Sequence, residues 1–216
     1  MANGLAVSYG NGTKSKLENV SAAVTYEFLS RVLEERSYKP LADKMATKML
    51  EELVCDPIDR KRVKEAAVLL QKLTEAFPDA GIENMTQQCE RLDIHHANAG
   101  RKYNLTVQHL FSDGITWGRV TLFYSFSIGF ALHVADRQMD ELVNSVRTWS
   151  VQVMNNKVNP WIHTNGGWES FIVFANKALS GKKDEDSTHS LGGKLLTAAA
   201  VVGVAAIAGF FAVRGT

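Results

Sequence analysis

The chain has 216 residues, of which 45% are hydrophobic, and a formal net charge of +1. This length is enough to bury one core, so we expect a single domain with appended segments. The charges are mixed along the sequence, which argues against a nucleic-acid-binding face, and the two cysteines, Cys55 and Cys89, lack metal-ligand spacing and are typical of a reducing compartment.

The N-terminal third predicts one long helix and one uncertain segment. Residues 1–14 are expected to be flexible, without the apolar run of a signal peptide. Ser15 and Glu18 match a capping box, and apolar residues at helical spacing follow as far as about Arg36. Residues 37–55 have an amphipathic pattern that fits either a short helix or a loop.

Three further helices are predicted before the middle of the chain. Asp56 and Pro57 mark a helix start, because an acid at the N-cap and proline at the first helical position are both favoured there. Apolar residues then recur at steps of three and four until Pro78 ends the helix. Similar spacing predicts a short helix over about 82–92 and another that ends near Leu110.

The helix expected from its N-cap, Thr116, to about Ala135 is apolar on nearly every side. Its only charged or imidazole side chains are Arg119 near the start and His133 near the end. A helix of this composition is buried on all sides. We therefore predict that it is the central helix of a bundle.

The remaining helices complete an all-α fold over residues 15–179. A helix with one apolar face follows and runs to about Val153. A short helix begins at Asn159, and two glycines separate it from a last helix that packs back on the core. The chain has only four prolines and no alternating strand pattern. The sequence therefore predicts a bundle of about eight helices.

The C-terminal segment is predicted to be a membrane anchor. Residues 180–193 form a polar linker, and residues 195–213 then contain no charge between Lys194 and Arg214. As a helix this segment would be about 28 Å long, close to the roughly 30 Å hydrocarbon core of a bilayer. We expect residues 194–214 to be a tail anchor, with the bundle facing the cytosol.

Arg119 is the most informative single residue. It lies in the first turn of its helix, where the helix dipole disfavours a cation, and so indicates a specific acidic partner. That partner is either another molecule or an internal acid such as Glu75 or Asp113. Gly118 leaves room for a foreign backbone or, equally, for ordinary helix packing. No nucleophile–base pair, metal-ligand cluster or cofactor loop is present in the sequence, so we expect neither an enzyme nor a metal or cofactor site.

Four segments together resemble the Bcl-2 family of apoptosis regulators. Residues 114–126, with Trp-Gly-Arg, resemble the family's first homology motif, and residues 161–168 resemble the second. Residues 26–38 resemble the fourth motif, and apolar positions over 66–77 match the third. Two departures stand out: Thr116 replaces the usual asparagine, and Thr74-Glu75 replaces the usual Gly-Asp.

The resemblance implies an eight-helix bundle with a hydrophobic groove. Partners of the family insert an amphipathic helix with four apolar residues and one aspartate, and the arginine that matches Arg119 receives the aspartate. Homo- or hetero-dimers are a further mode of association that the resemblance leaves open. Carried over by position, the groove residues are Phe77, Met85, Thr106, Val107, Leu110, Trp117, Gly118, Arg119, Leu122 and Phe126.

Two functions fit this resemblance. The first is a pro-survival regulator that binds the death-motif helices of pro-apoptotic relatives, at the mitochondrial outer membrane or endoplasmic reticulum. The altered Thr74-Glu75 pair favours it, because threonine should crowd close helix approach. The second is a Bak-like executioner that permeabilises the membrane; the stretch Phe130–Val134 is more similar to that class.

Overall fold

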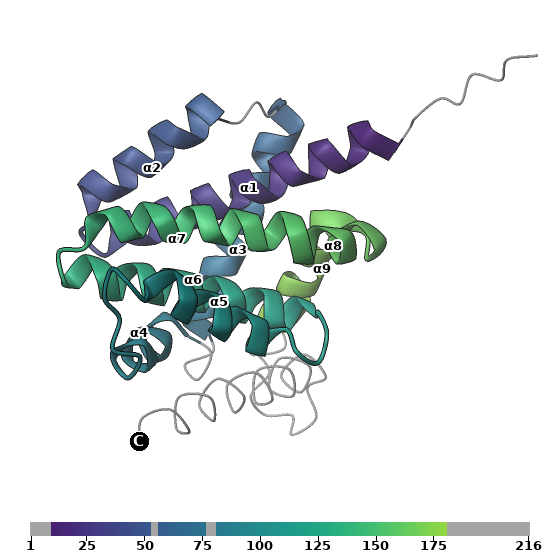
Figure 1. The fold of residues 1–216 in the computed structure, drawn as a ribbon. Coiled ribbons are helices and arrows are strands. Elements are labelled where there is room, and N and C mark those ends of the chain that lie inside the picture. Colours follow the sequence, from purple (N-terminus) through teal and green to yellow (C-terminus); the bar gives the residue numbers. More distant parts are fainter. Residues whose placement is uncertain (1–9, 53–55, 77–80, 181–216) are drawn as a thin grey trace, which may run out of the picture.

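The computed structural model describes residues 10–52, 56–76 and 81–180, and within them the chain is all-α (Figure 1). A π-helical turn, η2 (Met154–Val158), joins the seventh α-helix to the eighth. The α-helices are α1 (Gly10–Glu35), α2 (Lys39–Glu52), α3 (Pro57–Ala76), α4 (Ile82–Glu90), α5 (Ala99–Leu110), α6 (Trp117–Asp136), α7 (Asp140–Val153), α8 (Asn159–Thr164) and α9 (Gly167–Ser180).

Helix α6 is the centre of the bundle, as its composition predicts. Every residue from Gly118 to Ala135 is buried. Helices α1, α3, α4, α5 and α7 all contact it. In Figure 1, α2 lies at the top and α4 at the bottom of the described bundle, with α1, α7 and α6 between them.

Buried hydroxyl groups on α6 are hydrogen-bonded across the core. The Tyr103 hydroxyl on α5 lies 2.8 Å from the hydroxyls of both Ser127 and Ser150. The Tyr124 hydroxyl lies 3.0 Å from that of Thr25 on α1. Burial raises the pKa of both tyrosines, so they stay neutral. Because an unpaired buried hydroxyl costs about 1–3 kcal/mol, these pairs also favour one arrangement of the helices.

The predicted start of the first helix was wrong. Helix α1 begins at Gly10, so Ser15 lies inside it and is not its N-cap, and residues 10–14 are helical. A capping box indicates a helix end only when the helical hydrogen bonds stop there. Serine and glutamate are also ordinary residues of a helix interior. The sequence pattern alone does not separate these two cases.

The segment that fitted either a loop or a helix is the helix α2. Pro40 is its second residue, where a missing amide hydrogen costs nothing. Ala42 and Met45 are buried, and α2 packs against α1. This packing supplies the stabilisation that the short segment lacks by itself.

The two predicted N-caps are confirmed. The Asp56 carboxylate accepts a hydrogen bond of 2.8 Å from the amide of Asp59, and the Thr116 hydroxyl accepts one of 3.2 Å from the amide of Arg119. The Asp59 amide, with the Lys16 ammonium nearby, lowers the pKa of Asp56 to about 2. Both helices therefore begin where local chemistry predicts.

Ser180, the first residue of the predicted linker, is the last residue of α9; the rest of the linker and the tail anchor lie outside the described residues. Among the residues that are described, none of the helices combines the length and the apolarity that a bilayer crossing needs.

Candidate ligand-helix groove

The predicted groove residues lie on α4, α5 and α6, and nearly all of their side chains are inside the bundle. Trp117 is half-buried, and Phe77 lies outside the described residues. A ligand can reach the buried members only where the helices that carry them move apart. The buried members are Met85 on α4, Thr106, Val107 and Leu110 on α5, and Gly118, Arg119, Leu122 and Phe126 on α6.

Helix α4 packs very closely on α6 at Gly129. A Cβ added there would lie 2.8 Å from the Cβ of Met85 and 2.9 Å from the backbone nitrogen of Thr86. Real Cβ atoms do not approach that closely, so only glycine allows this contact. Met85 is fully buried as a result. The predicted groove is thus closed between α4 and α6.

Helix α5 forms the neighbouring wall through aromatic contacts. The ring of Tyr103 lies 5.3 Å from that of Phe126 and 5.5 Å from that of Phe130, measured between centroids. It also lies 5.4 Å from Trp149 on α7. Edge-to-face and tilted pairs of this kind add about 0.5–1.5 kcal/mol each to burial. Phe126 is therefore part of a continuous aromatic layer between α5, α6 and α7.

Arg119 has an internal acidic partner. One terminal nitrogen of its guanidinium lies 3.0 Å from a carboxylate oxygen of Asp113, and the other donates to the carbonyl of Gly114 at 3.0 Å. Of the two internal candidates that the sequence offered, Asp113 is the one observed. The Arg119 side chain is only 9% exposed, whereas that of Asp113 is 63% exposed. The ion pair joins the turn between α5 and α6, which carries Asp113, to the first turn of α6, which carries Arg119.

The third-motif residues as far as Ala76 lie on α3, which packs between α1 and α9 and also contacts α6. Thr74 is buried, and its hydroxyl donates to the carbonyl of Gln71 at 2.7 Å. Glu75 is exposed and accepts a hydrogen bond of 3.1 Å from the Gln71 side chain. Within the described part of the chain, neither Thr74 nor Glu75 is hydrogen-bonded to Arg119.

The first and second motifs meet in one aromatic cluster. The ring of Trp117, at the start of α6, lies 4.9 Å from that of Trp161 on α8. It lies 6.2 Å from Trp168 and 5.4 Å from Phe171, both on α9. Trp168 is buried and Trp161 is partly buried against the core, so both are packing residues. Gly166 and Gly167 make the turn into α9 with φ angles of +84° and +71°, which glycine adopts without strain.

A buried relay of hydrogen bonds fixes α9 to α1. The indole of Trp168 donates to the Ser21 hydroxyl at 2.9 Å, and that hydroxyl donates to the Asn159 amide oxygen at 2.6 Å. All three residues are buried. The sequence alone does not indicate this relay, because its members lie on three helices that are distant in the sequence.

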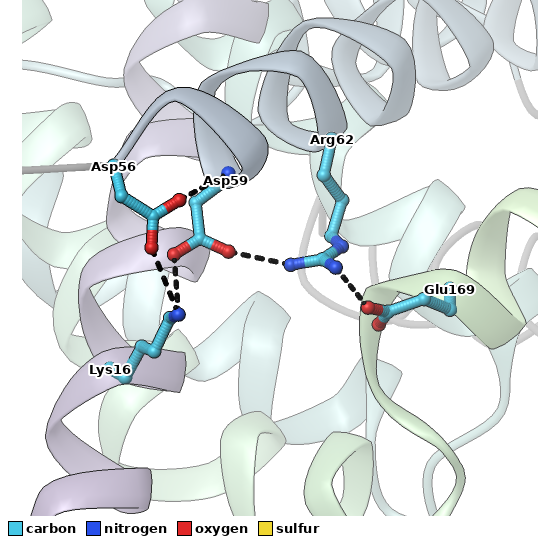
Figure 2. A network of polar contacts seen from close by, with 5 residues as sticks. All are labelled: Lys16, Asp56, Asp59, Arg62 and Glu169. Carbon is cyan, nitrogen blue, oxygen red and sulfur yellow. Dashed lines mark hydrogen bonds and ion pairs between the residues drawn. The ribbon is translucent and has the colours of Figure 1, made fainter.

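A network of charges, also missed from the sequence, fixes α3 to its neighbours (Figure 2). The Lys16 ammonium on α1 lies 3.1 Å from carboxylate oxygens of both Asp56 and Asp59. The Arg62 guanidinium lies 2.6 Å from Asp59 and 2.5 Å from Glu169 on α9. The signal available in the sequence was the i, i+3 spacing of Asp59 and Arg62. A cavity of about 150 Å³ opens beside these residues.

Among the described residues, His, Cys, Asp and Glu side chains form no group suited to holding a metal ion. The fold is a bundle with a buried central helix. Apolar side chains of α4, α5 and α6 pack against one another without an opening at Gly129, and we call this contact the apolar seam. Arg119 lies beside it, in the first turn of α6. These features define an all-α bundle built around a buried central helix.

Comparisons with known proteins agree with this class. The family described as "Apoptosis regulator proteins, Bcl-2 family" matches residues 70–168. Bcl-2-like protein 1 of Sus scrofa is 30% identical over 130 residues, which cover 57% of this chain and 54% of that protein. The chain thus spans about half the length of the first curated relatives that it matches. Over this part of its length the chain is similar to the Bcl-2 family.

Two solved structures have the same fold. One is Geodia cydonium BHP2 in complex with Lubomirskia baicalensis Bak-2, with a TM-score of 0.66 and 26% identity over 79% of this chain and 99% of that chain. The other is Trichoplax adhaerens trBcl-2L2 bound to trBak BH3, with a TM-score of 0.57 and 25% identity over 71% of this chain and 95% of that chain.

Proposed function

We propose that the chain is a pro-survival regulator of apoptosis that binds the amphipathic death-motif helix of Bak-like relatives. Its similarity to the Bcl-2 family, together with Arg119 beside the apolar seam of α4, α5 and α6, carries this proposal. Of the two solved structures described above, one is in complex with Bak-2 and the other is bound to trBak BH3, which supports the same class of partner. This is recognition of a helix in a groove.

Binding requires α4 and α5 to move away from α6, because Met85, Val107 and Phe126 are buried. Four apolar anchors of the partner, at roughly 1.5–3 kcal/mol each, would supply about 6–12 kcal/mol before association costs. Part of this free energy is used to separate α4 and α5 from α6. The apparent dissociation constant is therefore the intrinsic one divided by the fraction of molecules in which these helices are apart.

The pro-survival side is favoured by the surroundings of Thr74. An executioner exposes its own death-motif helix and inserts it into relatives, and a small residue lets that helix approach closely. Here the position is a threonine, whose hydroxyl is bonded to its own helix, and the next residue is the longer Glu75. A peptide of residues 59–80 should therefore be a poor ligand for family grooves.

The second candidate is a Bak-like executioner, and the uniform apolarity of α6 favours it. A helix buried on every side and a helix that inserts into a bilayer have the same composition. Dye-loaded liposomes separate the two candidates, with and without an activating helix. Release of dye by the protein without its tail would support the executioner, and intact liposomes would support the regulator.

We also propose that residues 194–214 anchor the protein in the mitochondrial outer membrane or the endoplasmic reticulum, with residues 15–179 in the cytosol. Only residues 195–213 carry this proposal, as a charge-free run of nearly bilayer length. Cell fractionation of the full chain and of a chain ending at residue 193 tests it. Equal membrane association of both would contradict it.

The groove itself is tested with a labelled Bak-type helix and two alanine variants. Gly129→Ala should push α4 away from α6, lower the melting temperature and raise the affinity, because opening then costs less. Ile58→Ala is the control for a substitution outside the groove, because Ile58 is 73% exposed at the start of α3. The control should leave the affinity within about twofold. Absence of saturable binding to the unaltered protein would refute the proposed function.

A further inference from the structure

Asp113 lies in the place that the acidic group of a ligand would take on Arg119. Its carboxylate oxygen is 3.0 Å from a terminal guanidinium nitrogen, and it comes from the turn between α5 and α6. We propose that Asp113 is a built-in competitor for Arg119, and that it sets how strongly the protein prefers acidic helices over neutral ones. This inference rests on the proposed function.

The geometry makes the pair separable. Asp113 is 63% exposed, so water screens its attraction for the guanidinium and solvates the carboxylate once it is released. It lies in a turn whose next residue, Gly114, has a φ of +103° and no atom within 4 Å of an added Cβ. The other oxygen of its carboxylate accepts a hydrogen bond of 3.3 Å from the Ser112 hydroxyl, in the same turn. Release of Asp113 from Arg119 therefore leaves the packing between helices in place.

Arg119 itself does not need Asp113 to keep its position. Its other terminal nitrogen donates to the Gly114 carbonyl at 3.0 Å, and its backbone amide is bonded to Thr116 at 3.2 Å. The rest of its side chain is buried. The guanidinium thus stays at the edge of the seam when the carboxylate leaves.

Competition follows from the sharing of one cation. A ligand carboxylate that reaches Arg119 lies close to Asp113, and two carboxylates at one cation repel each other. The ligand must therefore displace Asp113 or accept this repulsion. A neutral ligand meets no such repulsion. Asp113 lowers affinity for a helix with an aspartate and leaves affinity for the asparagine form of that helix nearly unchanged.

Asp113→Asn tests this directly in the full-length protein, with one Bak-type helix carrying aspartate and the same helix carrying asparagine. Affinity for the aspartate helix should rise about three- to tenfold, and affinity for the asparagine helix should stay within about twofold. Asp43→Asn on α2 is the matched control for the change in net charge, because Asp43 pairs with Lys39 far along the chain from Arg119. It should change neither affinity.

The remaining outcomes each have one meaning. Equal affinity of the Asp113→Asn variant and the unaltered protein for the aspartate helix would overturn the inference. Weaker binding would also overturn it, since Asp113 would then position Arg119. Asp113→Ala, with melting curves for both variants, guards against a folding defect of one substitution. If the unaltered protein binds neither helix, the proposed function fails, and the inference falls with it.

Discussion

Arg62 and Arg119 are both arginines near helix starts, but the structure uses their charges differently. Arg62 lies 2.5 Å from Glu169, an acid on another helix, and also neutralises the buried Asp59. Arg119 pairs with Asp113, which belongs to the turn directly before its own helix. The first charge holds helices together. The second holds only a turn, so a ligand can use it without loss of a contact between helices.

The largest expected effect is on ligand affinity. Arg119→Ala should weaken binding of an aspartate-bearing helix by about 2–5 kcal/mol, because the ligand carboxylate loses its partner in a largely desolvated place. The loss of folding free energy should be much smaller than the loss of binding free energy. Asp113 is exposed, so water can solvate its carboxylate once Arg119 is gone. Calorimetric titration and thermal melts of the same samples measure both. Collapse of the fold would show that Arg119 is a packing residue instead.

Arg62→Met should give the opposite pattern. It leaves Asp59, whose side chain is 4% exposed, with Lys16 as its remaining cation. We expect the free energy of unfolding to fall by about 1–3 kcal/mol, the cost of a buried charge that has lost a partner. Affinity for the helix should stay unchanged. If Arg62→Met lowered the affinity for the helix and left the free energy of unfolding unchanged, Arg62 would act in ligand binding as Arg119 does, and the two arginines would not differ in role.

Glu169→Gln tests the exposed end of the same network. Because the Glu169 side chain is 58% exposed, its ion pair with Arg62 should contribute no more than about 1 kcal/mol. Urea denaturation measures this, and high salt should reduce the difference between the two proteins. A larger loss, insensitive to salt, would mean that Glu169 stabilises the turn into α9 in another way.

The smallest effect is a dependence on pH at Asp56. Its pKa is about 2 in the folded protein and about 3.9 when unfolded, so the unfolded chain binds the proton more tightly. This contribution is complete above about pH 4 and is lost as pH falls through 2. The gap in urea midpoint between the unaltered protein and Asp56→Asn should narrow over that range. Parallel profiles of the two proteins would contradict the assignment.

The sequence predicted the features that depend on local chemistry. The buried central helix follows from its composition, and the N-caps at Asp56 and Thr116 follow from residue type. The start of α1 could not be predicted, because a capping box and a helix interior share residues. Helix α2 remained open because its stability comes from packing on α1.

The candidate site was predictable only in part. Helical spacing shows which side of α4 or α5 is apolar, but not whether another helix covers it; Met85 and Val107 turn out to be buried. The internal partner of Arg119 depends on the geometry of one turn, so Asp113 and Glu75 could not be separated in advance. The relay from Trp168 through Ser21 joins residues that only the tertiary fold brings together.

A double-mutant cycle between the protein and its ligand tests the central claim most directly. The cycle combines Arg119→Ala with replacement of the aspartate by alanine in a Bak-type helix, and the four dissociation constants are measured in one buffer. Direct pairing in the groove predicts a coupling free energy of at least about 1.5 kcal/mol. Additive effects, with a coupling below about 0.5 kcal/mol, would show that Arg119 does not receive the ligand's aspartate.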